Sequence, residues 1–212
     1  IMEEAKMYGR SPQTCQFPCK GEMNMNEVMN AILTRRSIRK FTADPIPAEV
    51  LEDLVKAALH APSGMGKQTW QFTVVTNQEI IHRLCGLIGT ELGREGYDMY
   101  GPAAVIIPSN EKESPWGKED NACAMENIFL AARSYGVGSV WINQMQNIND
   151  RPAVRALLDE IGVPADHVIY GVAALGYADP SVPVEPKERT GKVVYVKSVS
   201  YTHLTLPTNS LV

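Results

Sequence analysis

Apolar residues recur every three or four positions in two segments of the chain, which predicts two amphipathic helices. In residues 48–60 they form one stripe: Leu51, Leu54, Val55, Ala58 and Leu59. In residues 119–135, the longest expected helix, they form another: Met125, Ile128, Phe129, Ala132 and Tyr135. Gly136 follows, and glycine readily takes the left-handed conformation that ends a helix. Shorter helices are expected at 26–34, 78–88 and 152–161.

Short apolar runs between these helices predict strands. The expected strands are residues 71–76, 103–108, 138–142, 167–177 and 192–196. Strands and helices interleave, but they do not repeat as the regular strand–helix–strand units of a parallel sheet. The expected fold class is therefore α+β, with a mixed sheet between helices.

The two ends of the chain differ in composition from the segment between them. Residues 9–22 mix Gly, Pro, Cys, Gln and Lys without periodicity, and residues 198–212 are rich in Thr, Ser and Leu. Residue 1 is Ile, and residues 20–22 could be encoded by a purine run that resembles a ribosome-binding site. We therefore expect a domain at 23–197, with 1–22 a leader read in frame and 198–212 an appended tail. A native N-terminal extension is the alternative.

Composition narrows the function classes. The 212 residues are 44% hydrophobic and 21% charged, which suits one packed domain. The net charge of −4 gives no general attraction to nucleic acid. No apolar run approaches the ~18 residues of a membrane span. The four cysteines lack zinc or CxxC spacing: Cys15, Cys19, Cys85 and Cys123. We expect a cytoplasmic protein with free thiols, no metal, and no nucleic-acid or membrane partner.

A basic run follows the first expected helix: Arg35, Arg36, Ser37, Ile38, Arg39 and Lys40. The planar fork of arginine suits a phosphate or the carbonyl groups of a flavin ring, and Ser37 adds a hydroxyl. The alternative is a solvated helix end, where basic side chains meet the helix dipole.

A second candidate segment runs from Ala61 to Phe72 (APSGMGKQTWQF). Its glycines allow backbone N–H groups to approach a flat, polar-edged ring closely. Gln68 and Trp70 follow at the mouth of a strand. The alternative is a simple turn between a helix and a strand. Read with the basic run, the loop indicates a phosphorylated, planar cofactor, for which flavin mononucleotide (FMN) is the candidate.

Other motifs argue against different chemistry. Residues 136–141 (GVGSVW) lack the third glycine of a dinucleotide-binding fingerprint and open a strand after a helix, the reverse of the Rossmann order. Lys187 and Arg189 lie in a Pro-rich loop, and they matter only if that loop folds back on the basic run. No hydrolase, zinc-protease or phosphate-loop motif occurs, and the histidines are isolated. No catalytic side chain is therefore expected, because a cofactor would perform the chemistry.

Four segments together resemble the FMN-dependent nitroreductase family: RRSIRKF, APSGxxxQxW, DNACAMENIFLAA leading to GVGSVWI, and PKER. The resemblance covers roughly residues 25–197. It implies a nitroreductase-like fold, with a mostly antiparallel sheet flanked by helices in an intertwined homodimer that binds FMN at its interface. It also implies that the strand expected at 192–196 crosses to the partner's sheet.

The resemblance also implies roles for individual residues. Four would hold the phosphate, ribityl and pyrimidine parts of FMN: Arg35, Arg36, Ser37 and Arg39. Three would reach the flavin bound by the partner subunit: Pro62, Ser63 and Gly64. Three would lie beside the flavin ring: Trp141, Ile142 and Asn143. Lys187 and Arg189 would complete the phosphate site. Gly66 and Thr69 stand where family members often have Asn and Pro, so Lys67 or Gln68 would take over the Asn contact.

The activity that the resemblance implies is reduction of FMN by NADH or NADPH, followed by two-electron reduction of a nitroaromatic, quinone or similar acceptor. Because the chain has no separate nucleotide-binding fingerprint, both substrates would use one pocket in turn, as in a ping-pong mechanism. One alternative is a flavin-binding or flavin-storing protein without catalysis. Another is a regulatory or nucleic-acid-binding protein, which the negative net charge disfavours.

Overall fold

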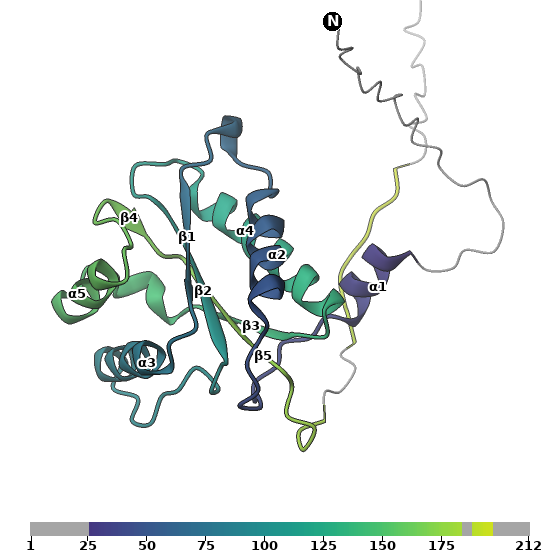
Figure 1. The fold of residues 1–212 in the computed structure, drawn as a ribbon. Coiled ribbons are helices and arrows are strands. Elements are labelled where there is room, and N and C mark those ends of the chain that lie inside the picture. Colours follow the sequence, from purple (N-terminus) through teal and green to yellow (C-terminus); the bar gives the residue numbers. More distant parts are fainter. Residues whose placement is uncertain (1–25, 184–187, 197–212) are drawn as a thin grey trace, which may run out of the picture.

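The computed structural model describes residues 26–183 and 188–196 (Figure 1). The expected leader at 1–22, the expected tail at 198–212 and the candidate site residue Lys187 lie outside the described residues.

The centre of the fold is a sheet with the strand order β1-β2-β5-β3, and β4 also pairs with β2. The strands are β1 (Trp70–Val75), β2 (Ala104–Glu111), β3 (Gly138–Ile142), β4 (His167–Val168) and β5 (Val172–Gly176). Every pairing between these strands is antiparallel, and one isolated parallel bridge joins Ser37 to Ser139. The expected α+β class with a mixed, mostly antiparallel sheet is thus confirmed.

Helices cover both faces of this sheet, with α2 and α4 on one side and α3 and α5 on the other (Figure 1). The helices are α1 (Glu27–Thr34), α2 (Ala48–Leu59), α3 (Gln78–Leu92), α4 (Gly117–Ser134) and α5 (Pro152–Glu160). Short 3₁₀ turns occur at η1 (Gly64–Gly66) and η2 (Gln144–Asn147). In the described residues, no helix has the length and apolar character needed to cross a membrane.

The core has two halves because successive residues of β2 point to opposite faces of the sheet. Val105 and Ile107 pack with the buried side chains of α3 and α5. Ala104 and Ile106 pack with those of α2 and α4. All four are at most 1% exposed. A strand buried on both faces has a continuous apolar run in its sequence. β2 could therefore be predicted although its residues do not alternate between apolar and polar.

One helix and one strand are longer than expected. The helix expected at 78–88 continues to Leu92 and ends at Gly93, whose φ is 62°. The strand expected at 103–108 continues through Ser109 and Asn110, which are polar but fully buried. Their side chains have partners: Ser109 Oγ lies 3.0 Å from His167 Nδ1, and Asn110 Oδ1 accepts from Thr69 Oγ1 at 2.6 Å. Hydrogen bonding lets these polar residues continue a buried strand.

The prediction of one strand at 167–177 was wrong. The segment 169–172 stands opposite the segment 107–109 of β2, so it is one residue longer than its partner. The extra residue interrupts the pairing as in a β-bulge. Gly171 lies in the interruption, where a Cβ atom would collide with the indole of Trp141. Trp141 therefore packs closely against the backbone at the interruption.

The expected strand at 192–196 is not formed in this chain. Residues 192–196 take part in none of the strand pairings, and a strand needs a neighbouring backbone. The side chains of Val193, Val194, Tyr195 and Val196 are all largely exposed, between 71% and 84%.

Candidate cofactor site

The basic run is held as an extended segment along the edge of β3. Ile38 N donates to Ser139 O at 3.0 Å, and Phe41 forms an antiparallel bridge with Ala178 near the end of β5. Successive side chains of an extended segment point to opposite sides. The run is therefore part of the fold and not a solvated continuation of α1. Arg36 Nη1 does reach back to the carbonyl oxygen of Leu33 at 2.8 Å, so the expected interaction with the helix end also occurs.

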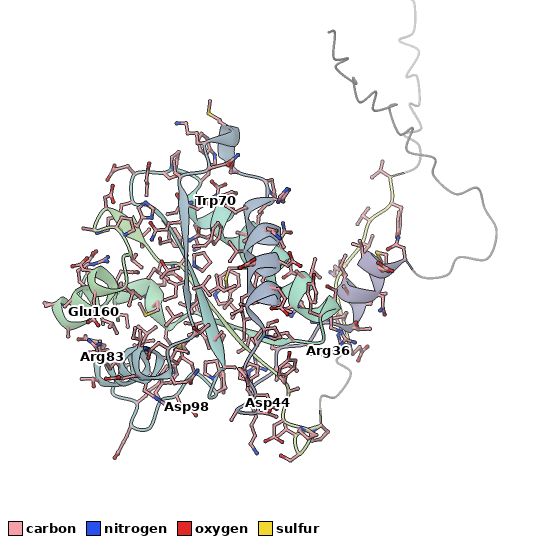
Figure 2. The ribbon with its side chains drawn as sticks, in the orientation of Figure 1. Arg36, Asp44, Trp70, Arg83, Asp98 and Glu160 are labelled. Carbon is pink, nitrogen blue, oxygen red and sulfur yellow. The ribbon has the colours of Figure 1, made fainter. Side chains whose placement is uncertain are left out.

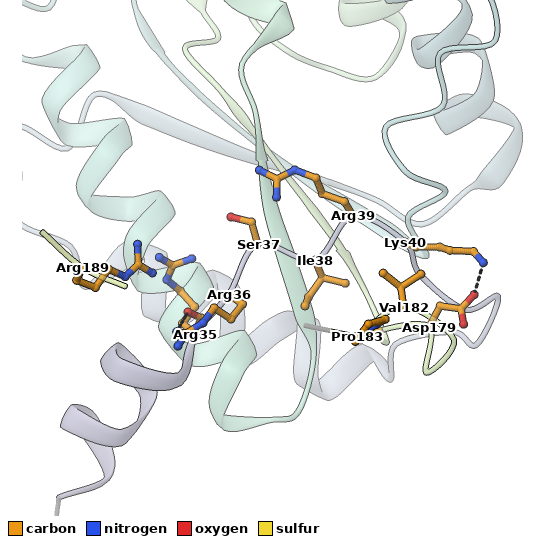
Figure 3. Close-up of a pocket in the computed structure, with 11 residues that line it drawn as sticks. Arg35, Arg36, Ser37, Ile38, Arg39, Lys40, Asp179, Val182, Pro183 and Arg189 are labelled. Carbon is orange, nitrogen blue, oxygen red and sulfur yellow. Dashed lines mark hydrogen bonds and ion pairs between the residues drawn. The ribbon is translucent and has the colours of Figure 1, made fainter. Parts of the chain in front are cut away.

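A pocket of about 380 Å³ opens over this segment (Figure 3). Its lining residues come from the basic run and from two later segments: Arg35, Arg36, Ser37, Ile38, Arg39, Lys40, Ala178, Asp179, Val182, Pro183 and Arg189. Arg189 therefore lies beside the basic run, which makes it a candidate for the same site. The volume falls in the range of ~300–1,000 Å³ common for small-molecule sites.

The charges in the pocket are only partly neutralised. Arg35, Arg36 and Arg189 lie together on one side, whereas Arg39 lies on the other side of Ser37 (Figure 3). Arg35 Nε is 3.5 Å from Glu126 Oε1, and this nitrogen is buried without a hydrogen-bond partner. A buried donor without an acceptor is costly, and an anion in the pocket would supply that acceptor.

Lys40 and Asp179 form the opposite wall. Lys40 Nζ lies 3.0 Å from Asp179 Oδ2 (dashed in Figure 3). Hydrogen bonds from Ser181, followed by the contact with Lys40, lower the pKa of Asp179 to about 2. The carboxylate thus fixes the segment around Ser181 against Lys40. Because Asp179 already pairs with Lys40, the arginines carry the charge that remains for a ligand.

A neighbouring hollow of about 350 Å³ shares Arg35 and Arg36 and extends the site toward the end of α4. Arg133 lines it, and its Nε donates to Thr34 Oγ1 at 2.9 Å. Arg133 was not predicted from the sequence, although a basic residue in the last helical turn before Gly136 could have indicated it. Lys40 belonged to the basic run but was not expected in the site, and nothing in the sequence pointed to Asp179.

The structure does not bring every expected residue into this pocket. Trp141, Ile142 and Asn143 follow one another at the end of β3 and do not line it. Ile142 is only 1% exposed, so its side chain belongs to the core. The Trp141 indole packs against Gly171 and meets Phe129 edge-on, with 6.2 Å between ring centroids.

The glycine-rich loop lies at the opposite end of α4 from Arg133. Gly64 N donates to Asp120 Oδ1 in the first turn of α4, whereas Arg133 is in the last turn. At 1.5 Å of rise per residue, these two ends of the helix are about 20 Å apart. Four expected residues are therefore absent from the basic pocket of their own chain: Pro62, Ser63, Gly64 and Gln68.

The pocket suits binding more than side-chain chemistry. Among the residues that the structure describes, its polar lining consists of arginines, Lys40, Asp179 and a serine hydroxyl, with no histidine or cysteine. Among residues 26–183 and 188–196, no three His, Cys, Asp or Glu side chains are grouped to hold a metal ion. Guanidinium groups, an unpartnered Nε–H and a hydroxyl are suitable donors for a phosphate.

Comparison with known proteins gives a consistent result. The model of the nitroreductase family matches residues 32–99 and 93–177. One relative is a protein of Archaeoglobus fulgidus that is named as an NADH dehydrogenase/NAD(P)H nitroreductase. It is 35% identical over 158 residues, which cover 72% of this chain and 86% of the relative. The NADPH-flavin oxidoreductase of Vibrio harveyi is 30% identical over 183 residues, covering 81% and 74%. The crystal structure of a nitroreductase with bound FMN from Bacteroides fragilis has a TM-score of 0.72 and 40% identity, covering 82% of this chain and all of that one.

Proposed function

Because this chain belongs to the nitroreductase family, we propose that it is an FMN-dependent oxidoreductase that takes hydride from NADH or NADPH. The observation that carries the proposal is the pocket in which Arg35 and Arg189, from distant parts of the chain, converge beside Ser37. The similar structure from Bacteroides fragilis contains FMN, which supports the same cofactor here. The flavin-binding domain is residues 23–197, within which the family match and the pocket both fall.

Each part of the pocket has a role toward FMN. The phosphate is held by arginines on one side of the pocket, Arg189 among them. Lys187, which lies outside the described residues, is proposed to complete that site. Ser37 and Arg39 bind the ribityl chain and the pyrimidine edge. Positive charge there stabilises the negative charge that reduction adds to a flavin. When bound, FMN supplies the redox chemistry by accepting a hydride and passing two electrons to the acceptor.

The end of β3 lies beside the flavin ring. Trp141, Ile142 and Asn143 contribute backbone groups there, since the Ile142 side chain is in the core. Gln68 or Lys67 of the glycine-rich loop replaces the contact that other members make with an Asn at the position of Gly66. Both side chains are exposed and free to reach a ligand outside their own subunit.

The active form is a homodimer with FMN at the interface. The glycine-rich loop, with Pro62, Ser63 and Gly64, contacts the flavin bound by the partner. Its position about 20 Å from the basic end of α4 supports contact across subunits more than within one. Two exposed apolar segments are available for such an interface: residues 193–196, and the face of α1 with Val28, Met29, Ile32 and Leu33.

Both substrates use one pocket. Residues 136–141 do not form a nucleotide-binding loop, so NAD(P)H and the acceptor occupy the same space over the flavin in turn. The acceptors that suit such an open site are nitroaromatics, quinones and similar planar compounds, reduced by two electrons in a ping-pong sequence.

An absorbance spectrum of the purified protein, followed by anaerobic addition of NADH and then NADPH in separate samples, tests this proposal. Bound FMN should give a yellow protein whose visible absorbance is bleached by at least one of the two donors. The bleached protein should regain its colour when a quinone or nitroaromatic is added. A bound flavin that neither donor reduces would instead support flavin storage, and a colourless protein that does not bind added FMN would contradict both functions.

A further inference from the structure

The glycine-rich loop has a backbone conformation that its own sequence does not favour. Met65 and Gln68 are not glycines, yet their φ angles are 53° and 51°, in the left-handed region. Internal hydrogen bonds shape the loop: Gly66 N donates to Ser63 O at 3.0 Å, and Gln68 N donates to Ser63 Oγ at 3.3 Å. Met65 is 79% exposed and therefore gains little from burial. A backbone of this kind persists when contacts outside the loop hold it.

One of these contacts is the carboxylate of Asp120. This side chain lies in the first turn of α4 and belongs to a residue that is only 5% exposed. Its Oδ1 accepts a hydrogen bond from Gly64 N at 2.9 Å. A carboxylate is favourable at the N-terminal end of a helix, and it is a stronger acceptor than a neutral oxygen.

The second contact is the ring of Trp116, the residue that caps α4. A Cβ atom on Gly64 would lie 2.5 Å from two ring atoms of Trp116, so only glycine allows this approach. Lys67 Nζ is 5.9 Å from the centre of the same ring. The first turn of α4 therefore holds the loop by ring packing and by one hydrogen bond, both at Gly64.

The far end of the loop is fixed independently. Thr69 Oγ1 donates to Asn110 Oδ1 at 2.6 Å, and Glu111 N donates to Thr69 O at 3.2 Å. Thr69 is thus fixed on β2 and Gly64 on α4, so both ends of the segment are held to the body of the subunit.

We propose that Asp120 is a positioning residue that acts across the dimer interface: by holding Gly64, it sets the loop of one subunit against the flavin bound by the other. This inference rests on the proposed function, in which residues 62–64 contact the partner's flavin. Asp120 itself touches neither flavin nor substrate. Its effect passes through the backbone of Gly64.

The first experiment compares FMN binding by the unliganded wild-type protein, Asp120→Ala and Asp120→Asn, using flavin fluorescence and the circular dichroism of the bound flavin. Asp120→Ala should raise the Kd roughly ten-fold or more, because it removes a hydrogen bond to a charged acceptor. It should also change the dichroism and speed hydrogen exchange in residues 62–68. Asp120→Asn keeps an oxygen that accepts from Gly64 N, so it should restore most of the affinity and the dichroism. Asp53→Ala, which removes an exposed carboxylate on α2, is the matched control and should bind FMN as the wild type does.

A hybrid dimer separates action across the interface from action within a subunit. It is made from one Arg35→Ala chain and one Asp120→Ala chain carrying different affinity tags. If the loop acts on the partner's flavin, the site of the Arg35→Ala chain also receives the loop of the Asp120→Ala chain and carries both defects. The other site has an intact Arg35 and an intact loop, so it carries neither. One flavin per hybrid dimer should then bind with wild-type affinity, although both parent dimers bind weakly. Two weakened sites in the hybrid would overturn the proposal.

Other outcomes are equally decisive. Faster exchange in residues 62–68 of Asp120→Ala with unchanged flavin affinity and dichroism would overturn the positioning role but leave the proposed function intact. A wild-type protein that does not bind FMN would overturn both. If Asp120→Ala does not fold, Trp116→Leu replaces it in both experiments, because it releases Gly64 from the other side. Wild-type affinity and dichroism in a folded Trp116→Leu would also count against the proposal.

Discussion

Arg35 and Arg189 line the same pocket, although they lie near opposite ends of the described chain. Two guanidinium groups on one side of a cavity repel each other, and the carboxylate nearest to Arg35, that of Glu126, is 3.5 Å away and outside hydrogen-bond geometry. The repulsion is relieved when an anion lies between them. The pair therefore indicates a site whose charge is balanced by its ligand.

Arg35→Ala should weaken FMN binding by ~1.5–3 kcal/mol, because it removes a charged donor whose Nε has no hydrogen-bond partner among the described residues. Titration of the unliganded protein with FMN measures the change. Arg83→Ala is the control: Arg83 pairs with Glu160 on the surface, on the other side of the molecule from Arg36 (Figure 2), and its loss should leave the Kd unchanged. Unchanged affinity in Arg35→Ala would remove this residue from the site.

The protein should be a dimer that binds two flavins. Ile32→Glu places a charge on the exposed apolar face of α1, and it should shift the protein toward monomer and raise the Kd for FMN together. Light scattering with parallel FMN titration checks both effects. Leu92→Glu alters a similarly exposed apolar residue at the end of α3 and should change neither. A wild-type monomer loaded with flavin would contradict the interface proposed for FMN.

If NAD(P)H and the acceptor use one pocket in turn, as proposed, initial rates should follow a ping-pong pattern. Double-reciprocal plots against NAD(P)H at several fixed acceptor concentrations should therefore give parallel lines. Lines that intersect would mean that both substrates are bound at the same time. That would require a second binding site, and the described residues contain no nucleotide-binding loop to form one.

Gly171→Ala should destabilise the protein by about 1–3 kcal/mol, since the added methyl group collides with the indole of Trp141. The tryptophan fluorescence should change as well, because the ring must move. Gly86→Ala should have the opposite effect. Gly86 lies in the middle of α3, and a Cβ atom added there would meet no atom within 4 Å, so the substitution should stabilise the protein by about 0.4–1 kcal/mol. Urea unfolding of both variants tests the pair, and a stable Gly171→Ala would argue against close packing of Trp141 on this backbone.

The contact between Asp179 and its partners should weaken in acid. Hydrogen bonds from Ser181 and the charge of Lys40 lower the pKa of Asp179 from 3.8 to about 2 in the folded state. A lowered carboxyl pKa stabilises the fold above the unfolded value and loses that contribution as the pH falls toward the folded value. The stability difference between the wild type and Asp179→Asn should thus be constant above about pH 5 and shrink between pH 4 and pH 2. Urea unfolding at stepped pH measures it, and a difference that grows in acid would refute the assignment.

The sequence predicted most elements, and it singled out the basic run that lines the pocket, because these signals are local. The stripe in α2 and the consecutive residues 35–39 need no knowledge of distant contacts. What it could not predict depends on tertiary contacts. At the interruption before β5, Trp141 packs on Gly171, and in the extension of β2, Ser109 meets His167. Arg133 lines the neighbouring hollow, where the packing of α1 on α4 brings Thr34 to its Nε.

The order in which the pocket is completed has a consequence during synthesis. Residues 35–39 leave the ribosome early, but they become ordered against Ser139, which is made much later, and Arg189 follows near the end of the described chain. The cofactor site therefore cannot exist on a growing chain until most of the sheet has been translated. Capture of flavin at the proposed site is then a late step in the synthesis of a new polypeptide.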